Sequence, residues 1–145
     1  ENPRLIDAFN FTVLTPGDKG SVGDFEYEAF PMYNLFNSWH PREKNFTGFI
    51  FTVHGYRIYV AGDTDLIDEH LLLANTIDVA IIPTPPAGNP MMTFQFALDF
   101  VELVQPKIVI PYHFETSDLE LFSHFVTQIN ASIQCVYQDF PLILK

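Results

Sequence analysis

The sequence predicts an α/β fold with a mixed β-sheet, and three features indicate this class. First, three apolar runs of strand length, residues 57–62, 78–83 and 107–111, each end at a glycine or a proline. Second, a helical segment separates each run from the one before it, so these strands should lie parallel and be joined by right-handed crossovers. Third, acidic and apolar residues alternate over residues 24–29, which is typical of a strand near a sheet edge with one solvated face.

The first third of the chain predicts strands joined by turns. A short strand is expected over residues 10–14, and the turn-forming residues 15–20 should then reverse the chain. A longer strand is expected over residues 21–32. Residues 33–45 have no periodicity and predict a long exposed or functional loop.

Two neighbouring strands are expected over residues 46–53 and 56–61. The His54-Gly55 dipeptide between them has the length and the glycine of a tight hairpin turn. His54 should therefore lie at a solvated turn tip and not in a metal site.

Helices are expected in the second half of the chain. Asp65 or Asp68 is a candidate cap for a short helix, and Thr93 is the candidate cap for the next. Pro106 should end that second helix. Residues 117–120 have the pattern of a capping box and predict the start of a third helix.

The chain is expected to close with two strands, over residues 133–137 and 140–144. Its one cysteine, Cys135, lies in the first of them, where a buried and inert thiol is expected. A single cysteine forms no internal disulfide, which suits a reducing compartment, and we expect a cytoplasmic protein.

Composition sets limits on the function. The length of 145 residues predicts one domain, and 48% hydrophobic residues suffice for a core. Seven basic against 18 acidic residues give a formal net charge of −11, which would repel a nucleic-acid backbone or an anionic membrane surface. No segment is long and apolar enough to span a membrane. We therefore expect neither nucleic-acid nor membrane partners.

Polar residues follow the three apolar runs at the same predicted sheet edge. Asp63 comes after the first run, Thr84 after the second, and His113 after the third. Parallel strands place their carboxyl ends together, which is where α/β proteins bind ligands and metals. A carboxylate with an imidazole suits zinc, manganese or iron better than calcium or magnesium. The alternative remains open that Asp63 is a turn or capping carboxylate and His113 a hydrogen-bonded strand end.

Seven short segments follow one another between residues 31 and 114, and their succession is more specific than any one of them. They are Pro31-Met-Tyr-Asn34, His40-Pro41, Gly48-Phe-Ile50, Arg57-Ile-Tyr-Val-Ala-Gly-Asp-Thr-Asp65, Ile77-Asp-Val-Ala-Ile-Ile-Pro83, Met92-Thr93 and Pro106-Lys-Ile-Val-Ile-Pro-Tyr-His-Phe114. Together they resemble the second half of a metallo-β-lactamase-fold metal-dependent hydrolase, in the branch that contains UlaG-like lactonases.

The resemblance implies that residues 1–145 form one half of an αββα sandwich, with helices on one face of a mixed sheet. In that family two metal ions, commonly zinc, hold a hydroxide that attacks an ester, lactone or phosphodiester of a small-molecule substrate. Asp63 matches the aspartate that bridges the metals, and His113 matches the last histidine ligand. His40 is the best match for the middle histidine, with Asn34 as the competing position. Near them, the resemblance and the sheet edge suggest that Asn34, Thr84 and Tyr112 line the substrate pocket.

One departure from the family pattern is large. The His-x-His-x-Asp-His motif of the first half is absent, since no two histidines of this chain lie two residues apart. His70 and His124 are expected on helix surfaces and do not replace it. Each metal would keep about two protein ligands, fewer than the three of a catalytic zinc. The chain alone is expected to bind metal weakly or not at all, and to be inactive.

Three explanations follow from this departure. The chain is the C-terminal piece of a hydrolase whose N-terminal half is another chain or has been lost. Alternatively, it is a half-fold without activity that acts as a binding or assembly module, paired with a partner or with a second copy of itself. In the third explanation it is a complete small α/β domain whose matching segments are structural. Residues 83–90 are expected to lie near the pocket mouth, where a rigid crossover loop is the alternative.

Overall fold

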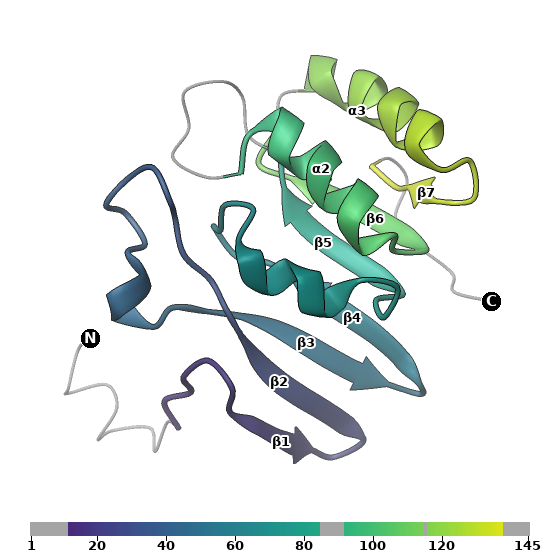
Figure 1. Cartoon of the computed structure of the whole chain (residues 1–145). Helices are drawn as coiled ribbons and strands as arrows, with labels where there is room; N and C mark the ends of the chain where they lie inside the picture. Colours follow the sequence, from purple (N-terminus) through teal and green to yellow (C-terminus); the bar gives the residue numbers. More distant parts are fainter. Residues whose placement is uncertain (1–11, 85–91, 115, 138–145) are drawn as a thin grey trace.

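A computed structural model describes residues 12–84, 92–114 and 116–137 of the chain (Figure 1). Seven strands form one sheet, and their order in the sheet is their order in the sequence. The strands are β1 (Lys19–Val22), β2 (Phe25–Pro31), β3 (Thr47–Val53), β4 (Tyr56–Val60), β5 (Val79–Pro83), β6 (Ile108–Tyr112) and β7 (Gln134–Cys135). The helices are the 3₁₀ turns η1 (Arg42–Lys44) and η2 (Asp68–Leu73) and the α-helices α2 (Phe94–Val104) and α3 (Thr116–Ile129).

The sheet is mixed, as the sequence predicts. Strands β1 to β4 pair antiparallel, and β4 to β7 pair parallel. The turn between β3 and β4 contains His54 and Gly55, both at positive φ (49° and 82°), which is the geometry of a tight hairpin turn. His54 is exposed at its tip. The predicted hairpin is therefore confirmed, and so is the parallel pairing of β4, β5 and β6.

The first third of the chain differs from the prediction. Residues 12–14 form no strand, and residues 10 and 11 lie outside the described part of the chain. The single strand predicted over residues 21–32 is wrong, because Gly23 and Asp24 make a turn that separates β1 from β2. Gly23 has a φ of +60°, which favours glycine, so the chain reverses there. The edge strand is consequently β1, and β2 lies next to it.

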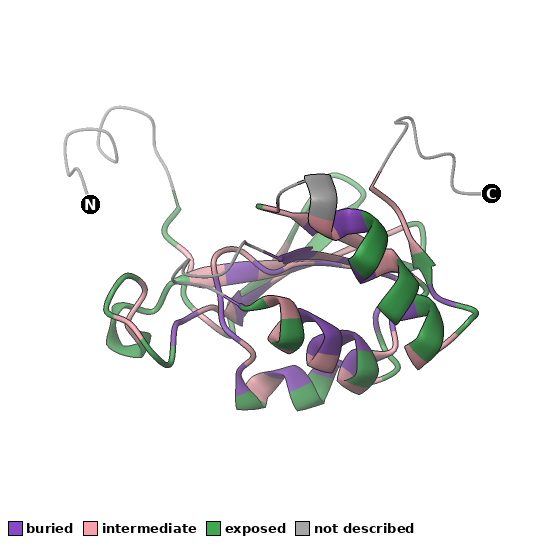
Figure 2. Ribbon diagram, turned by 90° about the horizontal axis from the view of Figure 1, so that it is seen from above, coloured by how far each residue is buried: buried purple, intermediate pink, exposed green. Residues whose placement is uncertain are grey.

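The core lies between the helices and one face of the sheet (Figure 2). Tyr59, Ala80 and Val109 stand in register on β4, β5 and β6, and all three are fully buried. Helix α2 covers them with an apolar stripe that includes Phe100 and Val104. This helix begins as predicted, because the side chain of its N-cap Thr93 accepts a hydrogen bond from a backbone N–H of the first turn.

His70 lies inside this core, which contradicts the predicted surface position. It is fully buried on η2, with its ring stacked against Phe30 and edge-on to Phe100. Its Nδ1 accepts a hydrogen bond from the backbone N–H of Ile67 (3.2 Å), and its Nε2 lies 2.8 Å from the hydroxyl of Tyr59. Burial is possible because both ring nitrogens have partners. The sequence alone does not reveal those partners.

The opposite face of the sheet is also apolar. The paired positions Phe49 and Val60, and Phe51 and Ile58, share this face, and Ile81 continues it on β5. These five side chains are only partly buried, and none belongs to the core cluster that packs with the helices. Figure 2 shows η2 and α2 together on the other side of the sheet. The sheet therefore has one covered face and one apolar face without a described helix on it.

The end of the described chain is close to the prediction. Strand β7 is shorter than expected, and the strand predicted over residues 140–144 lies outside the described residues. Cys135 is only partly buried, which differs from the predicted buried position, and burial raises the pKa of its thiol to about 11 and so keeps it protonated. His124 is exposed on α3, also as expected. No helix in the described part of the chain could span a membrane.

Candidate metal site

The structure brings Asp63 and His113 together. Asp63 follows β4 and His113 follows β6, so both lie at the carboxyl edge of the parallel strands. Asp63 Oδ1 is 3.4 Å from His113 Nε2. The sheet thus places side by side the two residues for which the sequence predicts metal binding.

The distance between the two side chains suits an ion pair or two ligands of one metal ion better than a direct hydrogen bond. Typical N–H···O hydrogen bonds span about 2.7–3.2 Å. Two ligands of one tetrahedral zinc ion, each about 2.0–2.1 Å from the metal, lie about 3.3 Å apart. The Asp63 and His113 side chains are also 37% and 54% exposed, so an ion can reach both. The pair therefore fits two positions of a metal's coordination shell.

Left-handed backbone positions next to these strands direct the two side chains. Gly62 precedes Asp63 with a φ of +68°, and a Cβ atom there would lie 3.3 Å from Met32 Cγ. His113 itself has a φ of +58°. Non-glycine residues seldom adopt this conformation, and such residues occur often at functional sites. The chain thus turns sharply at both strand ends.

Tyr112 ties the two strand ends to each other. Its hydroxyl donates a 2.6 Å hydrogen bond to the carbonyl oxygen of Gly62. Burial, with a smaller effect from the charge of Asp63, raises the pKa of Tyr112 well above its ordinary value. The hydroxyl therefore remains a proton donor to the backbone beside Asp63.

Thr84 lies at the same edge but is almost completely buried. Its backbone N–H donates to the carbonyl oxygen of Tyr112 at 2.8 Å, and its hydroxyl lies 3.4 Å from the same oxygen. The Thr84 side chain therefore contacts the end of the neighbouring strand β6. Apart from Pro83 and Thr84, the loop predicted near the pocket mouth, residues 83–90, lies outside the described residues.

Asn34 connects His40 to Asp63. The Asn34 side-chain amide donates to the carbonyl oxygen of Asp63 (2.9 Å), and its Oδ1 lies 2.9 Å from His40 Nδ1. His40 thus reaches the site through Asn34. In the described ranges, however, no three histidine, cysteine or acidic side chains form a group that could hold a metal. His40 does not join Asp63 and His113 in one three-ligand group.

Asp65 holds the loop that carries Asn34. Its carboxylate, 3% exposed, accepts a 2.7 Å hydrogen bond from the backbone N–H of Leu35 and another from that of Phe36. Burial raises the pKa of Asp65, and the two backbone hydrogen bonds oppose this shift. Asp65 therefore does not cap a helix, as one alternative predicted. Asp68, the other predicted cap, is the first residue of η2 and not its N-cap, which is Ile67. The sequence offered one signal for the role of Asp65, a second carboxylate directly before the apolar pair Leu66-Ile67.

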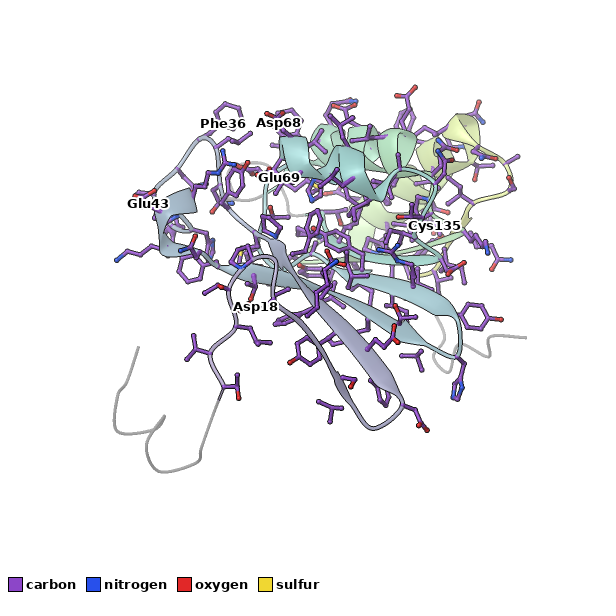
Figure 3. The ribbon with its side chains drawn as sticks, turned by 60° about the horizontal axis from the view of Figure 1, so that its bottom comes forward. Asp18, Phe36, Glu43, Asp68, Glu69 and Cys135 are labelled. Atoms are coloured by element: carbon purple, nitrogen blue, oxygen red, sulfur yellow. The ribbon has the colours of Figure 1, made fainter. Side chains whose placement is uncertain are left out.

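A second anchor joins the same loop to η2. Glu69 accepts hydrogen bonds from the Tyr33 hydroxyl and from Arg42 Nη2, both at 2.7 Å. The Arg42 guanidinium also lies 5.0 Å from the centre of the Tyr33 ring. Burial and the hydrogen bond to Glu69 raise the pKa of Tyr33 to about 12. Figure 3 shows Glu69 on η2 and Phe36 at the outer tip of the loop.

Three large apolar side chains of this loop are exposed, and sequence reasoning missed them. Leu35, Phe36 and Trp39 are 51%, 76% and 71% exposed. Phe36 stacks on Phe96 of α2, with ring centres 6.1 Å apart. These side chains form an apolar rim on the loop that carries Asn34 and His40.

Comparisons with known proteins agree with this architecture. The profile of the β-lactamase superfamily domain matches residues 2–113. A protein of Carboxydothermus hydrogenoformans called UPF0173 metal-dependent hydrolase is 42% identical over 110 residues, which cover 73% of this chain and 42% of that protein. A solved structure from Parabacteroides distasonis, by name a metal-dependent hydrolase, has a TM-score of 0.78 and 29% identity over 94% of this chain and 62% of its own.

A more distant structure shows the fold alone. The metallo-β-lactamase fold protein YhfI of Bacillus subtilis has a TM-score of 0.70 at 8% identity, and the match covers 96% of this chain and 59% of that one. The mixed sheet with its helices therefore has the metallo-β-lactamase fold. In all three comparisons with individual proteins, the chain spans less than two thirds of the relative's length.

Proposed function

Because the chain belongs to the β-lactamase superfamily domain family, we propose that it is part of a metal-dependent hydrolase. The observation that carries the proposal is the Asp63–His113 pair, whose 3.4 Å separation suits two ligands of one metal ion. The names of the Carboxydothermus and Parabacteroides relatives support the same activity class.

The donor set indicates the metal and the role of each residue. One carboxylate and two imidazoles suit zinc, with manganese and iron as alternatives. In a two-metal site Asp63 would bridge the ions, His113 would hold the second and His40 the first. When bound, the metal supplies Lewis-acid activation of water and of an ester, lactone or phosphodiester.

Other residues of the chain hold this donor set in place. Tyr112 and Asn34 donate hydrogen bonds to the backbone carbonyl oxygens of Gly62 and Asp63, so the backbone that carries the proposed bridging carboxylate is held at two points. Asp65 fixes the loop that leads to His40. The apolar rim on that loop would lie along the approach to the site and favour substrates with an apolar part.

The proposed site needs ligands beyond those that the described residues bring together. The described residues gather two donors at one point, whereas a catalytic zinc normally has three protein ligands. We place the others on an N-terminal half, either in the same polypeptide or as a partner chain. The apolar sheet face formed by residues such as Phe51 and Val60 is the surface that such a half would cover.

A second candidate function is a non-catalytic assembly module, and two observations favour it. The described residues contain no three-ligand metal group, and one sheet face is apolar without a described helix on it. Such a module would cover that face with a partner or a second copy of itself.

Native mass and elemental analysis of the purified protein distinguish the two functions. The hydrolase predicts two metals per complex and a segment beyond these 145 residues in the measured mass.

Hydrolysis of a nitrophenyl ester, a γ-lactone and a nitrophenyl phosphodiester would identify the reaction. For whichever of these substrates is hydrolysed, Asp63→Ala should reduce the rate of hydrolysis at least about 100-fold, because the proposed bridging ligand is lost. His124→Gln, on the exposed side of α3, is the matched control. A metal-free homodimer with none of these activities would contradict the hydrolase and leave the assembly module.

A further inference from the structure

Asn34 occupies a position that controls the chemistry of His40. It is 6% exposed and lies between the carbonyl oxygen of Asp63 and the ring of His40. The two contacts of its side chain are both 2.9 Å long. One buried amide therefore joins two of the three proposed ligand residues.

The chemistry of the partners fixes the orientation of this amide. A backbone carbonyl oxygen only accepts hydrogen bonds, so the group of Asn34 that faces Asp63 must be its NH₂. The side-chain oxygen of Asn34 then faces His40, and an amide oxygen also only accepts. The hydrogen of that second contact must come from His40, which requires a proton on Nδ1.

The proton on Nδ1 determines what the other ring nitrogen can do. A neutral imidazole carries one N–H, so with the proton on Nδ1 the Nε2 atom keeps its lone pair. A metal ion binds a ring nitrogen that has a lone pair, and metal-binding histidines usually donate the other N–H to a fixed acceptor. A histidine side chain free in water prefers the opposite tautomer. The hydrogen bond that His40 donates to Asn34 thus selects the tautomer that can bind a metal through Nε2.

The position of the ring is fixed as well as its tautomer. The backbone N–H of Asn34 donates to the carbonyl oxygen of His40 at 2.8 Å, which closes the loop between them. The His40 ring lies edge-on to Phe46, with ring centres 5.1 Å apart. No described residue forms a hydrogen bond with Nε2 of His40.

We propose that Asn34 is a positioning residue that holds His40 in the Nδ1–H tautomer and leaves Nε2 as its metal-binding atom. The inference rests on the proposed function, in which His40 is a metal ligand. The tautomer, however, exists without the metal and can be measured in its absence.

The test is a long-range ¹H–¹⁵N correlation spectrum of the histidine rings in ¹⁵N-labelled, metal-free protein at about pH 8, where an ordinary histidine is neutral. The expected result is a pyrrole-type shift for Nδ1 of His40 and a pyridine-type shift for its Nε2. Asn34→Leu should move His40 toward the Nε2–H tautomer. Asn34→Asp loses the N–H donor to the Asp63 carbonyl oxygen but keeps an acceptor for the Nδ1–H group of His40, so the Nδ1–H tautomer should remain.

Asn37→Leu is the matched control, because it makes the same change in the same loop. Asn37 accepts a hydrogen bond from the backbone N–H of Trp39, and its substitution should leave the His40 tautomer unchanged. Amide spectra with wild-type dispersion would show that each variant folds. Should Asn34→Leu not fold, the wild-type spectrum decides, because an Nε2–H tautomer of His40 overturns the proposal.

A zinc titration of the same samples adds the functional consequence. Asn34→Leu should weaken the zinc-dependent shift of His40 about 10- to 100-fold, the usual effect of removing a partner of a metal ligand. An Nε2–H tautomer in the wild type, or an unchanged Nδ1–H tautomer in Asn34→Leu, would overturn the proposal. A wild-type Nδ1–H tautomer with no response of any histidine to zinc would instead support the role of Asn34 and show that this chain alone does not hold the metal.

Discussion

Asp63 and Asp65 are two residues apart, yet their surroundings give them different roles. Asp63 is partly exposed and faces His113, so its carboxylate can bind a ligand from solution. Asp65 is buried and faces the backbone N–H groups of Leu35 and Phe36. Thr64, the residue between them, donates a hydrogen bond from its hydroxyl to the carbonyl oxygen of Tyr33 at 3.1 Å. A single strand end therefore supplies both the proposed metal ligand and the support for the loop beside it.

Asp65→Ala should destabilise the protein by about 1–3 kcal/mol, since it leaves two buried N–H groups without an acceptor. Asp65→Asn keeps an acceptor oxygen and removes a buried charge, so it should cost less than about 1 kcal/mol. Burial raises the folded-state pKa of Asp65, so the protonated carboxyl favours folding, and this contribution is lost as pH rises through that pKa. Urea unfolding at neutral pH measures these changes, with the exposed Asp68→Ala as control. Equal destabilisation by the two Asp65 variants would argue against this role.

His70 should make the fold sensitive to acid. Burial lowers its pKa to about 3, from 6.5 for an ordinary histidine. As the pH falls below the ordinary histidine pKa, His70 takes up a proton in the unfolded chain but not in the folded one. The free energy of unfolding therefore decreases by about 1.4 kcal/mol per pH unit. Between about pH 7 and about pH 5 the loss should be about 2 kcal/mol by urea unfolding.

Two variants separate this effect from that of the carboxylates. His70→Gln removes the titrating group, so its stability should depend less on pH over the same interval. His124→Gln changes an exposed histidine on α3 and should retain the wild-type dependence. The same pH dependence in all three proteins would show that His70 is not the source.

At the scale of helices and strands, the sequence predicts secondary structure best where a run of residues is uniformly apolar. The apolar runs that become β4, β5 and β6 are buried by the sheet and the helices, so their hydrophobicity alone indicates strands. Thr93 predicts the start of α2 because its cap is a local interaction. The division of β1 from β2 was missed because it depends on the backbone of Gly23, within a stretch that alternates like one strand.

The turn after β4 gives a prediction at this scale. Gly62→Ala should destabilise by about 1–2 kcal/mol, because alanine is strained at a positive φ. The new Cβ would also meet Met32 and displace Asp63, so the zinc-dependent shift of His113 should weaken. Gly55→Ala is the control, since Gly55 has a φ of +82° and nothing within 4 Å of a Cβ. It should cost a similar strain energy and leave the zinc response intact. A normal zinc response in Gly62→Ala would show that this turn does not position Asp63.

For the whole molecule, the predictable part of the site is the part set by the sheet. Asp63, Thr84 and His113 were expected at one edge because parallel strands bring their ends together, and the structure places them there. The link from Asn34 to His40 and the burial of His70 depend on contacts across the fold. No periodicity or motif in the sequence reports such contacts, because they arise only when distant segments pack.

The open sheet face predicts an assembly. Phe51→Asp lies outside the helix-side core, so the chain should remain folded. In the assembled protein, a charge at this partly buried apolar position should weaken association by a factor of about 10 or more. Native mass spectrometry over a concentration series measures this, and Leu72→Asp, at a 74% exposed position on η2, is the control. Unchanged association in Phe51→Asp would show that this face is not the interface.

The central claim is that Asp63 and His113 bind one metal ion. A zinc titration of the ¹⁵N-labelled chain, followed through the ring nitrogens of His113, tests it most directly. The claim predicts a saturable shift of His113 Nε2 that disappears in Asp63→Ala and persists in His124→Gln. A His113 ring that does not respond to millimolar zinc, or that responds equally in Asp63→Ala, would contradict it.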